Sequence, residues 1–576
     1  MNIMNALAQS GSKVAVTDMV IVFIYLIGIM IIGILAGYRK NTTSEQFFLA
    51  GKSLRWPMIG AALFTANIST IHLVGLSASG FSEGIVVGNF EWMASFCLII
   101  LGLIFVPFYI RTKINTLPEF LEKRYNKTCK MIMAFIAIWS ALLVHIGVSL
   151  FAGAKVFDYF FGIPVIYSII IIAVVTAIYT ILGGLKAVVV TDAIQAVLLL
   201  GGCIILTILG VLKLPGIGIY SFADLKAATQ PEQLSMVHSL RDANGNFNEY
   251  SWLTVMFGYY VLGIWYWCTD QTIVQKTLGA KDLRNGQLGA IFAGCLKILP
   301  LFFMVFPGVI AYVLFKDQIS DPNDTLTVMI DNLLPPVLKG LFAASLLAAV
   351  MSTVEAALNS TATVTAEDIC KHIWPNLKDS TLVVIGRITS GIVIVLAMIW
   401  SPYCEKFRNI FVVINKVPMM FAPAITTVFV LGVFWERGTK QAAITTFIVG
   451  LVAGLLYFLI DLPHNVPVEQ VQSAVSAQRI PQTNIIDGIV YNYETINHGW
   501  GIPYMMMGLI LLTTCIVVYV ITSLLTPAPT NDELEKMDWQ SPLKVITRTR
   551  ITGLTDPRIM AGGLFILMVI LYYILR

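Results

Sequence analysis

The chain has 576 residues, of which 57% are hydrophobic and only 12% are charged, and its mean hydropathy is +0.81. A soluble domain carries about 25% charged residues, so this composition excludes a soluble protein and indicates a polytopic membrane protein. The net charge of +4 comes with no basic tract interleaved with aromatic residues, so nucleic acid is not an expected partner.

Apolar runs long enough to cross a bilayer recur along the whole chain. With about 20 residues per crossing, we expect about fourteen helices and an all-α fold. The first run has no cleavage site and is expected to be a retained span, not a signal peptide. The expected helices are centred on 17–38, 57–80, 91–110, 130–153, 164–183, 187–212, 252–273, 288–315, 336–365, 381–401, 408–435, 440–460, 501–525 and 558–575.

Lys and Arg gather in alternate loops, and this pattern sets the expected orientation. The connections 39–55 and 111–130 are rich in Lys and Arg, whereas 81–90 carries none. Short positive loops stay in the cytoplasm, so we expect both termini and the long polar segments 213–251 and 461–500 outside. The lack of a targeting signal favours a bacterial inner membrane.

Two expected spans carry polar and small residues where a lipid-facing helix would be aliphatic. One is 57–80, with Asn67, Ser69, Thr70 and His72. The other is 252–273, where an aromatic run is interrupted by Gly258, Gly263, Thr269, Asp270 and Gln271. Unsatisfied backbone groups cost several kcal/mol in lipid, so broken helices persist only beside a cavity. Close helix packing explains one such segment equally well. Two of opposite orientation favour a transporter with broken midplane helices.

Several ionisable side chains lie deep within the expected spans, where each is costly unless it is paired or hydrated. Lys297 is roughly 15 Å from the inner end of its helix, which favours a hydrogen-bond donor to a polyol or carboxylate. Glu91 begins a helix, where the helix dipole alone would favour an acid, but the nearby broken helix supports a functional role.

Four more ionisable side chains lie inside the expected spans. Asp192 fits either a cation exit site or a solvated vestibule carboxylate, and Glu355 lies near the middle of a helix of small residues. His145 is expected to be a hydrogen-bonded core histidine. Lys416 is a further candidate for a buried functional group.

Sodium is a hard cation that takes oxygen ligands. The adjacent hydroxyls of Ser352 and Thr353 suit such a site if they face the expected break at 65–68. Hydroxyl residues are common in membrane helices, so this pair alone does not define a sodium site.

Five motifs together resemble the sodium/glucose cotransporters of the solute:sodium symporter family, from about residue 17 to 436. WYWCTDQ followed by IVQ is specific to the sugar-type branch, and GG…AV…TD…Q is general to the family. The motifs are QFFLAGKS at 46–53, NFEW at 89–92, ILGGLKAVVVTDAIQ at 181–195, WYWCTDQTIVQKTLGAKD at 265–282 and LNSTATV at 358–364.

The resemblance implies a LeuT-type fold, in which two inverted five-helix repeats are flanked by further spans. The chain is then one transmembrane symporter domain, 1–576. Its expected parts are a first helix and loop at 17–55, a first repeat at 56–212, a second repeat at 252–435 and C-terminal helices at 436–576.

The resemblance also implies site residues and a sodium ion as the coupling ion. The implied sodium ligands are the carbonyls of Thr65, Ile68 and Ala349 and the hydroxyls of Ser352 and Thr353. The implied substrate site consists of Asn67, His72, Glu91, Ser95, Lys297, Asn415 and Tyr266. Leu76, Phe90 and Phe411 occupy the outer-gate positions, and Asp192 lies on the sodium route, with Glu355 as a second cation-route candidate.

Four positions depart from the family pattern and bear on the substrate. Asn415 is shorter than the usual Gln, Gly263 lacks a polar side chain, and Glu355 replaces a small or hydroxyl residue. Lys416 adds a positive charge that would suit an acidic sugar.

The expected function is therefore sodium-coupled import of a sugar or sugar-like polyol by alternating access. Symport of an acidic sugar or another organic solute, and a sugar sensor that does not transport, are the alternatives. The HExxH, GxSxG and P-loop patterns are absent from the sequence, so enzymatic activity is not expected. The sequence predicts no particular oligomeric state.

Overall fold

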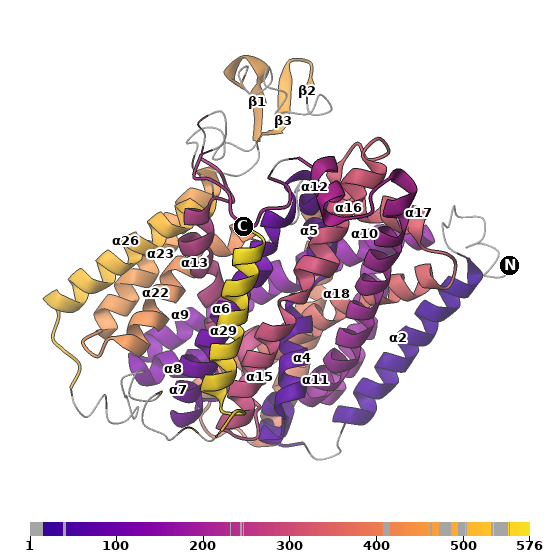
Figure 1. The fold of residues 1–576 in the computed structure, drawn as a ribbon. Coiled ribbons are helices and arrows are strands. Elements are labelled where there is room, and N and C mark those ends of the chain that lie inside the picture. The colour runs from indigo at the N-terminus through magenta and orange to yellow at the C-terminus, as the bar shows by residue number, and fades with distance from the viewer. Residues whose placement is uncertain are drawn as a thin grey trace.

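Long helices packed side by side form the body of the protein (Figure 1). The computed structural model describes residues 15–38, 42–230, 232–241, 245, 247–406, 415–460, 464–471, 485–493, 502, 504–530, 534, 546, 551 and 553–576.

Long helices and short helical segments occur in both halves of the chain. The N-terminal half contains α2 (Val16–Gly37), α3 (Ser44–Leu49), α4 (Trp56–Asn67), α5 (Thr70–Ser82), α6 (Asn89–Ile100), α7 (Val106–Arg111), α8 (Leu117–Arg124), α9 (Lys127–Ser140), α10 (Ser149–Phe161), α11 (Val165–Lys213) and α12 (Phe222–Ala228). The C-terminal half contains α13 (Tyr259–Ile264), α14 (Gln271–Leu278), α15 (Leu283–Leu296), α16 (Phe306–Phe315), α17 (Thr325–Leu333), α18 (Leu338–Thr363), α19 (Lys371–Ile373), α20 (Asp379–Trp400), α22 (Ala422–Phe434), α23 (Lys440–Ile460), α26 (Tyr504–Leu525) and α29 (Pro557–Ile574).

Among the described residues, ten helices are long and apolar enough to cross a membrane, and the bent pair α4 and α5 makes an eleventh candidate. The expectation of a helical polytopic membrane protein is thus confirmed. The expected spans at 164–183 and 187–212 are the two parts of α11, which are separated by a kink at Gly184. Those at 252–273 and 408–435 are divided into short segments or lie partly outside the described residues, so the count of about fourteen stays a prediction.

The first expected break is present between α4 and α5, which are bent by 64°. Ile68 and Ser69 are extended there, with φ −80°, ψ 102° and φ −99°, ψ 170°. The His72 side chain reaches back to the break, where its Nδ1 lies 3.0 Å from the Ser69 hydroxyl and 3.3 Å from the Ser69 backbone nitrogen. The imidazole therefore caps the second half of the broken helix.

The second expected break lies at Asp270, one of the polar residues expected to interrupt this span, and the two glycines of the span stay helical. Gly258 and Gly263 are within continuous helical and π-helical segments, whereas Asp270 is extended with φ −85° and ψ 126°. Its carboxylate accepts a hydrogen bond from the backbone N–H of Thr272, 2.7 Å away, and so caps α14. The aromatic run before Asp270 is wound as a π-helix over Trp265–Thr269.

The prediction of an all-α fold is wrong in one region outside the helical body. Three short strands, β1 (His464–Pro467), β2 (Ile485–Ile486) and β3 (Ile489–Tyr493), form an antiparallel sheet of order β1-β3-β2. Hydropathy windows tuned to spans do not detect such short strands in a polar loop. The sheet lies beyond the ends of the helices (Figure 1) and takes no part in the core.

A kink at Gly184 joins the two expected spans that form α11. Gly184 has φ 59° and ψ −159°, a region that is essentially restricted to glycine. A Cβ atom at this position would lie 2.5 Å from the carbonyl oxygen of Phe47 in α3. Helix α11 packs against α2 and α18, so the kink sets the position of several neighbouring helices.

We expect Gly184→Ala to lower the unfolding temperature of the purified protein by several degrees. The strained backbone costs about 1–3 kcal/mol, and the clash with α3 adds to it. Gly201→Ala in the same helix is the matched control, because a Cβ there meets nothing within 4 Å. Thermal unfolding in detergent measures both variants, and equal unfolding temperatures would contradict the assignment.

Candidate functional site

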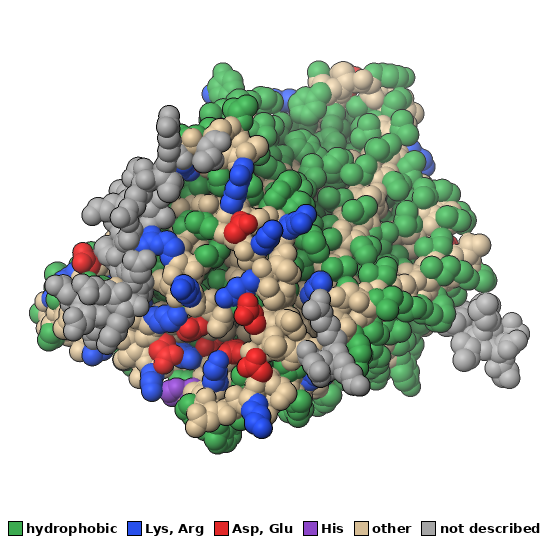
Figure 2. All heavy atoms as spheres, turned by 90° about the horizontal axis from the view of Figure 1, so that it is seen from below, with side chains coloured by type: hydrophobic (Ala, Val, Ile, Leu, Met, Phe, Trp, Pro, Cys, Tyr) green, Lys and Arg blue, Asp and Glu red, His purple; other side chains and the backbone are tan. Residues whose placement is uncertain are grey.

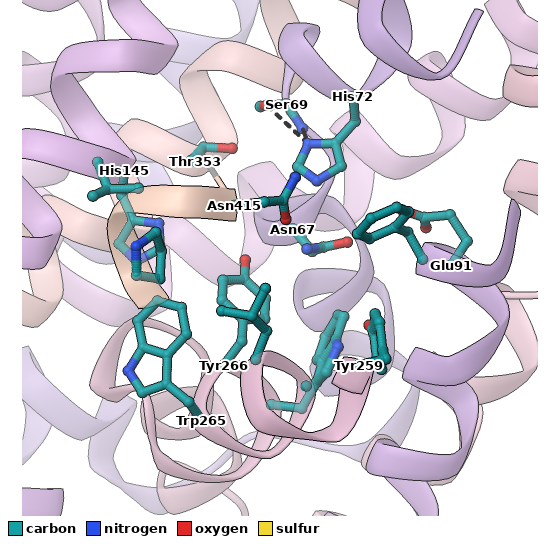
Figure 3. A pocket seen from close by; sticks show the side chains of 16 residues that line it. Asn67, Ser69, His72, Glu91, His145, Tyr259, Trp265, Tyr266, Thr353 and Asn415 are labelled. Carbon is teal, nitrogen blue, oxygen red and sulfur yellow. Dashed lines mark hydrogen bonds between the residues drawn. The ribbon is translucent and has the colours of Figure 1, made fainter. Parts of the chain in front are cut away.

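A cavity lies beside the break between α4 and α5 (Figure 3). Its wall combines polar side chains near the break with aromatic side chains from the seventh expected span. The lining residues are Asn67, Ser69, His72, Phe90, Glu91, Val144, His145, Tyr259, Leu262, Gly263, Trp265, Tyr266, Trp267, Thr353, Asn415 and Pro418.

A buried ion pair lies directly behind the polar wall. Nζ of Lys297, which follows the end of α15, is 2.5 Å from Oε2 of Glu91 in α6 and also donates to the side-chain oxygen of Asn67. The ammonium lies 5.6 Å from the ring centre of Phe64 and 5.3 Å from that of Trp267, so cation–π contacts cover its other sides. Lys297 is 0% exposed and Glu91 2% exposed. The pair fixes the carboxylate and amide groups that face the cavity without adding net charge.

Aromatic rings form the opposite wall of the cavity. The ring centres of Trp265 and Tyr266 are 5.9 Å apart, those of Tyr266 and Trp267 are 5.1 Å apart, and both pairs are edge-to-face. Phe90 meets Tyr259 edge-to-face at 6.2 Å. Figure 3 shows Tyr259, Tyr266 and Trp265 along one side, with Asn67, His72 and Glu91 across from them. Flat apolar faces opposite hydrogen-bonding groups suit a ring-shaped solute with hydroxyl groups.

Most of the predicted substrate residues meet at this cavity, but Ser95 does not. Its hydroxyl donates to the carbonyl oxygen of Gly294, 2.9 Å away, and thereby joins α6 to α15. The structure therefore gives Ser95 a packing role. Lys297 does not line the cavity, but its ammonium donates to Asn67 and Glu91, which do. The predicted substrate residues that line the cavity are Asn67, His72, Glu91, Tyr266 and Asn415.

The three predicted outer-gate residues are placed differently. Phe90 lines the cavity and contacts Tyr259. Leu76 is fully buried in α5 and is not among the lining residues. Phe411 lies outside the described residues.

The predicted sodium residues converge where α18 packs against α4. The Thr353 hydroxyl donates to the carbonyl oxygens of Ala349, 3.2 Å away in its own helix, and Ala66, 3.3 Å away in α4. The Ser352 hydroxyl donates to the carboxylate of Asp192 in α11. The Thr65 hydroxyl lies 3.4 Å from the Asp192 carbonyl oxygen, so α4, α11 and α18 meet at one point. Ile68 forms the break itself.

Asp192 and Glu355 belong to one buried cluster beside this point. The Glu355 Oε2 atom accepts from the Thr191 hydroxyl at 2.9 Å, and Glu355 and Asp192 interact electrostatically. Asp192 Oδ2 is 3.9 Å from Nζ of Lys276, which also donates to the Thr272 carbonyl oxygen at 3.3 Å. Asp192 thus pairs with a buried ammonium group, and Glu355 lies beside Asp192 in the same cluster.

Lys276 is the functional candidate that the sequence interpretation missed. Lys276 counts as a loop residue in the charge pattern, but it lies in α14 and is 1% exposed. His145 is buried with its Nε2 atom 3.2 Å from Asp270 Oδ2, as expected of a hydrogen-bonded histidine, and it also lines the cavity. The Lys in the motif that follows the aromatic run was the available signal for Lys276. Lys416 is buried next to Asn415 but is not among the lining residues.

The chain matches the sodium:solute symporter family over residues 47–450. It is 32% identical over 552 residues to sodium/glucose cotransporter 4 of Mus musculus, with 91% of this chain and 77% of that protein covered. It is 29% identical over 550 residues to sodium/myo-inositol cotransporter 2 of Mus musculus, with 91% and 79% covered.

Two solved transporter structures have a similar fold. A Na+-coupled sialic acid symporter in a substrate-bound outward-open state matches with a TM-score of 0.73 and 18% identity, covering 90% of this chain and 99% of that chain. A nucleobase-cation-symport-1 family transporter in a closed conformation matches with a TM-score of 0.51 and 14% identity, covering 87% and 99%. These similarities concern the arrangement of the helices.

The Lys297–Glu91 pair leads to a prediction about stability. Lys297→Met leaves a buried carboxylate without its partner, which costs about 3–5 kcal/mol, whereas the double variant with Glu91→Gln removes both charges and recovers most of that loss. Unfolding temperatures of the two single variants and the double variant in detergent measure the coupling. Strictly additive losses would show that the two side chains do not act as a pair.

Proposed function

The chain belongs to the sodium:solute symporter family, and on this premise we propose that it imports a sugar or polyol together with sodium. One observation carries the proposal. Thr353 lines the cavity and is also one of the two adjacent hydroxyl residues at the expected sodium site. A solute and an ion that bind on either side of one side chain change each other's binding affinity, and symport requires such coupling.

The chemistry of the cavity supports a neutral solute with several hydroxyl groups. Asn67, Glu91 and Asn415 present hydrogen-bonding groups, and the aromatic wall offers flat faces. Relatives named as sodium/glucose and sodium/myo-inositol cotransporters support the same class of solute. The Lys297 ammonium, which contacts Asn67 and Glu91 of the cavity wall, is already neutralised by Glu91. This pairing favours a neutral sugar or polyol over an acidic sugar.

We assign the coupling ion to the junction of α4 and α18, with the carbonyl oxygens of Thr65, Ile68 and Ala349 as ligands. The hydroxyl oxygens of Ser352 and Thr353 complete the set. The Ser352 hydroxyl donates its hydrogen bond to Asp192, so the lone pairs of its oxygen are free to face a cation. The adjacent carboxylate raises the local affinity for positive charge without being a direct ligand.

The buried cluster of Asp192 and Glu355 continues from this ion site and serves as the cation route. Among the described residues, Lys276 is the ammonium group that pairs with Asp192, and Glu355 adds a second fully buried carboxyl group beside it. Carboxyl groups in the interior of a membrane protein commonly mark ion pathways.

Transport follows from alternating access of this shared site. Sodium binding at the break of α4 stabilises the outward-open arrangement, and the solute then binds against Asn67, Glu91 and the aromatic wall. The outer gate, formed by Leu76, Phe90 and Phe411, closes before the inner side opens. Each sodium ion that enters down a potential of 100 mV gains about 2.3 kcal/mol, which is enough to concentrate a neutral solute.

The proposed architecture is one transmembrane domain of LeuT type with both termini outside. Its parts are the first helix and loop at 17–55, inverted repeats at 56–212 and 252–435, and C-terminal helices at 436–576. Breaks near the start of both repeats support this division. The start of α2 and the end of α29 lie toward the same side of the molecule (Figure 1). The opposite face carries a cluster of Lys and Arg side chains with Asp and Glu among them (Figure 2), as expected of the cytoplasmic side.

Removing both hydroxyls from the ion site, in Ser352→Ala with Thr353→Ala, is expected to abolish sodium-stimulated uptake into proteoliposomes. Two of the cation's oxygen ligands are lost, and alanine cannot replace them. The matched control is Thr513→Ala with Thr514→Ala in α26, where both exposed hydroxyls bond only to their own helix. Sodium dependence that survives in the Ser352 and Thr353 variant would remove the site assignment.

A competition panel tests the class of solute. We expect neutral hexoses or myo-inositol to inhibit uptake and uronic or sialic acids to do so at least about tenfold more weakly, because Lys297 is already paired. Lys416→Ala should leave this order unchanged. A preference for acidic sugars that Lys416→Ala reverses would favour the acidic-sugar alternative instead.

A further inference from the structure

A glycine lies in the helix that carries the aromatic wall of the cavity, at a position where the backbone does not require one. Gly263 is part of α13 and lines the cavity. Its backbone is helical, and a glycine inside a helix is less favourable than an alanine because it loses more conformational freedom on folding. The reason for this glycine therefore lies in its surroundings.

The surroundings of Gly263 leave no room for a side chain. A Cβ atom at this position would lie 2.6 Å from Cε1 of the Tyr259 ring and 2.7 Å from Sγ of Cys97 in α6. Contacts of a Cβ atom below 3.0 Å essentially do not occur. Tyr259 precedes Gly263 by four residues, so the two positions are neighbours on one face of the helix. The ring can therefore occupy its present place only because position 263 carries no side chain.

The Tyr259 ring forms the end of the cavity at which Glu91 lies. It lines the cavity and meets Phe90 edge-to-face, with the ring centres 6.2 Å apart. Phe90 also contacts Tyr250 of the preceding loop, and those ring centres are 6.3 Å apart. The Tyr259 side chain interacts electrostatically with the Glu91 carboxylate, and Figure 3 shows both side chains at the same end of the cavity. A bulky ring thus lies beside the carboxylate of the proposed solute site.

The position of one large ring matters because the cavity is small. Its volume is about 80 Å³, whereas sites for drug-sized ligands have about 300–1,000 Å³. A buried tyrosine covers roughly 150–250 Å² of surface, so it makes up a large part of such a wall. The Tyr259 ring therefore decides how far a solute extends toward Glu91.

We propose that Tyr259 sets the size limit for the solute at the Glu91 end of the cavity, and that Gly263 is the positioning residue that makes room for the ring. The inference rests on the proposed uptake of a sugar or polyol. An unsubstituted solute packs against the ring with its hydroxyl groups toward Glu91. A solute that carries an alkyl group on one of these hydroxyls collides with the ring.

Competition by monomethyl ethers of the transported solute tests the size limit. The labelled solute is glucose or myo-inositol, whichever the sodium gradient accumulates in proteoliposomes. We expect at least one ether to inhibit at least about tenfold more weakly than the parent compound, because a fitted pocket discriminates one carbon by about 10–200-fold. Tyr259→Ala should lower this ratio to less than about threefold, since the ring no longer limits the space.

Tyr260→Ala is the matched control, because Tyr260 is the next residue in the same helix and is not among the lining residues. It should keep the ratio of the unmodified protein. Tyr259→Leu decides the question if Tyr259→Ala does not fold. Ethers that all compete as well as the parent compound with the unmodified protein, or a ratio that the folded Tyr259 variants leave unchanged, would overturn the size limit.

A second comparison tests the positioning role of Gly263. Every variant in it carries Cys97→Ala, which removes the other close contact of a Cβ atom at position 263. We expect Gly263→Ala to raise the KM of the parent solute by about tenfold, because the methyl group pushes the Tyr259 ring into the cavity. Adding Tyr259→Ala should bring the KM to within about threefold of Tyr259→Ala without the glycine change, since the methyl group then meets no ring.

Gly201→Ala serves as the glycine control, because a Cβ atom there meets nothing within 4 Å. Additive increases in KM for Gly263→Ala and Tyr259→Ala would show that the two residues act separately, and would overturn the positioning role. If the unmodified protein shows no sodium-stimulated uptake of either labelled solute, the proposed function fails instead.

Discussion

A charged or polar group in the hydrocarbon core of a membrane must find a partner, and this constraint organises the interior of the protein. Lys297, Glu91 and Asn67 satisfy one another on one side of the broken helix α4 and α5. Asp192, Glu355 and Lys276 form a second group on the other side. The first group is electrically balanced, and the second combines two carboxyl groups with one ammonium group. This difference fits the proposed roles of a solute site, which needs fixed hydrogen-bonding groups, and of an ion path, which needs acidic groups.

The broken helix links the two groups physically. Extended backbone at Ile68 and Ser69 frees carbonyl groups near α18, while Asn67 at the end of α4 faces the cavity. Thr353 bonds to the carbonyl oxygen of Ala66 and lines the same cavity, so a cation and a solute would meet at one short segment. Coupling between them then requires no long-range pathway, because one movable element contacts both. The second break, at Asp270, gives α14 its own freedom beside the ion path.

The sequence predicted the chemistry of single side chains better than their partners. The depth of Lys297 in an apolar helix identified it without any knowledge of the fold, and Asp192 and Glu355 stood out for the same reason. Lys276 was missed because the charge pattern placed it in a cytoplasmic loop. The chain breaks at Asp270, and Lys276 lies in the buried helix that follows, α14. The contacts of Ser95 with Gly294 and of His145 with Asp270 could not be predicted, since they depend on tertiary packing that periodicity does not contain. The small sheet at 464–493 was beyond the reach of hydropathy windows designed for spans.

The central claim is that sodium entry drives solute accumulation, and a gradient experiment in proteoliposomes tests it most directly. Purified protein is reconstituted, and the uptake of radiolabelled glucose or myo-inositol is followed with an inward sodium gradient, with equal sodium on both sides, and with potassium replacing sodium. The account predicts that one of these solutes rises transiently above its external concentration only under the sodium gradient, and that an inside-negative potential enhances the rise. Uptake of the transported solute that merely equilibrates, at the same rate in all three conditions, would contradict it.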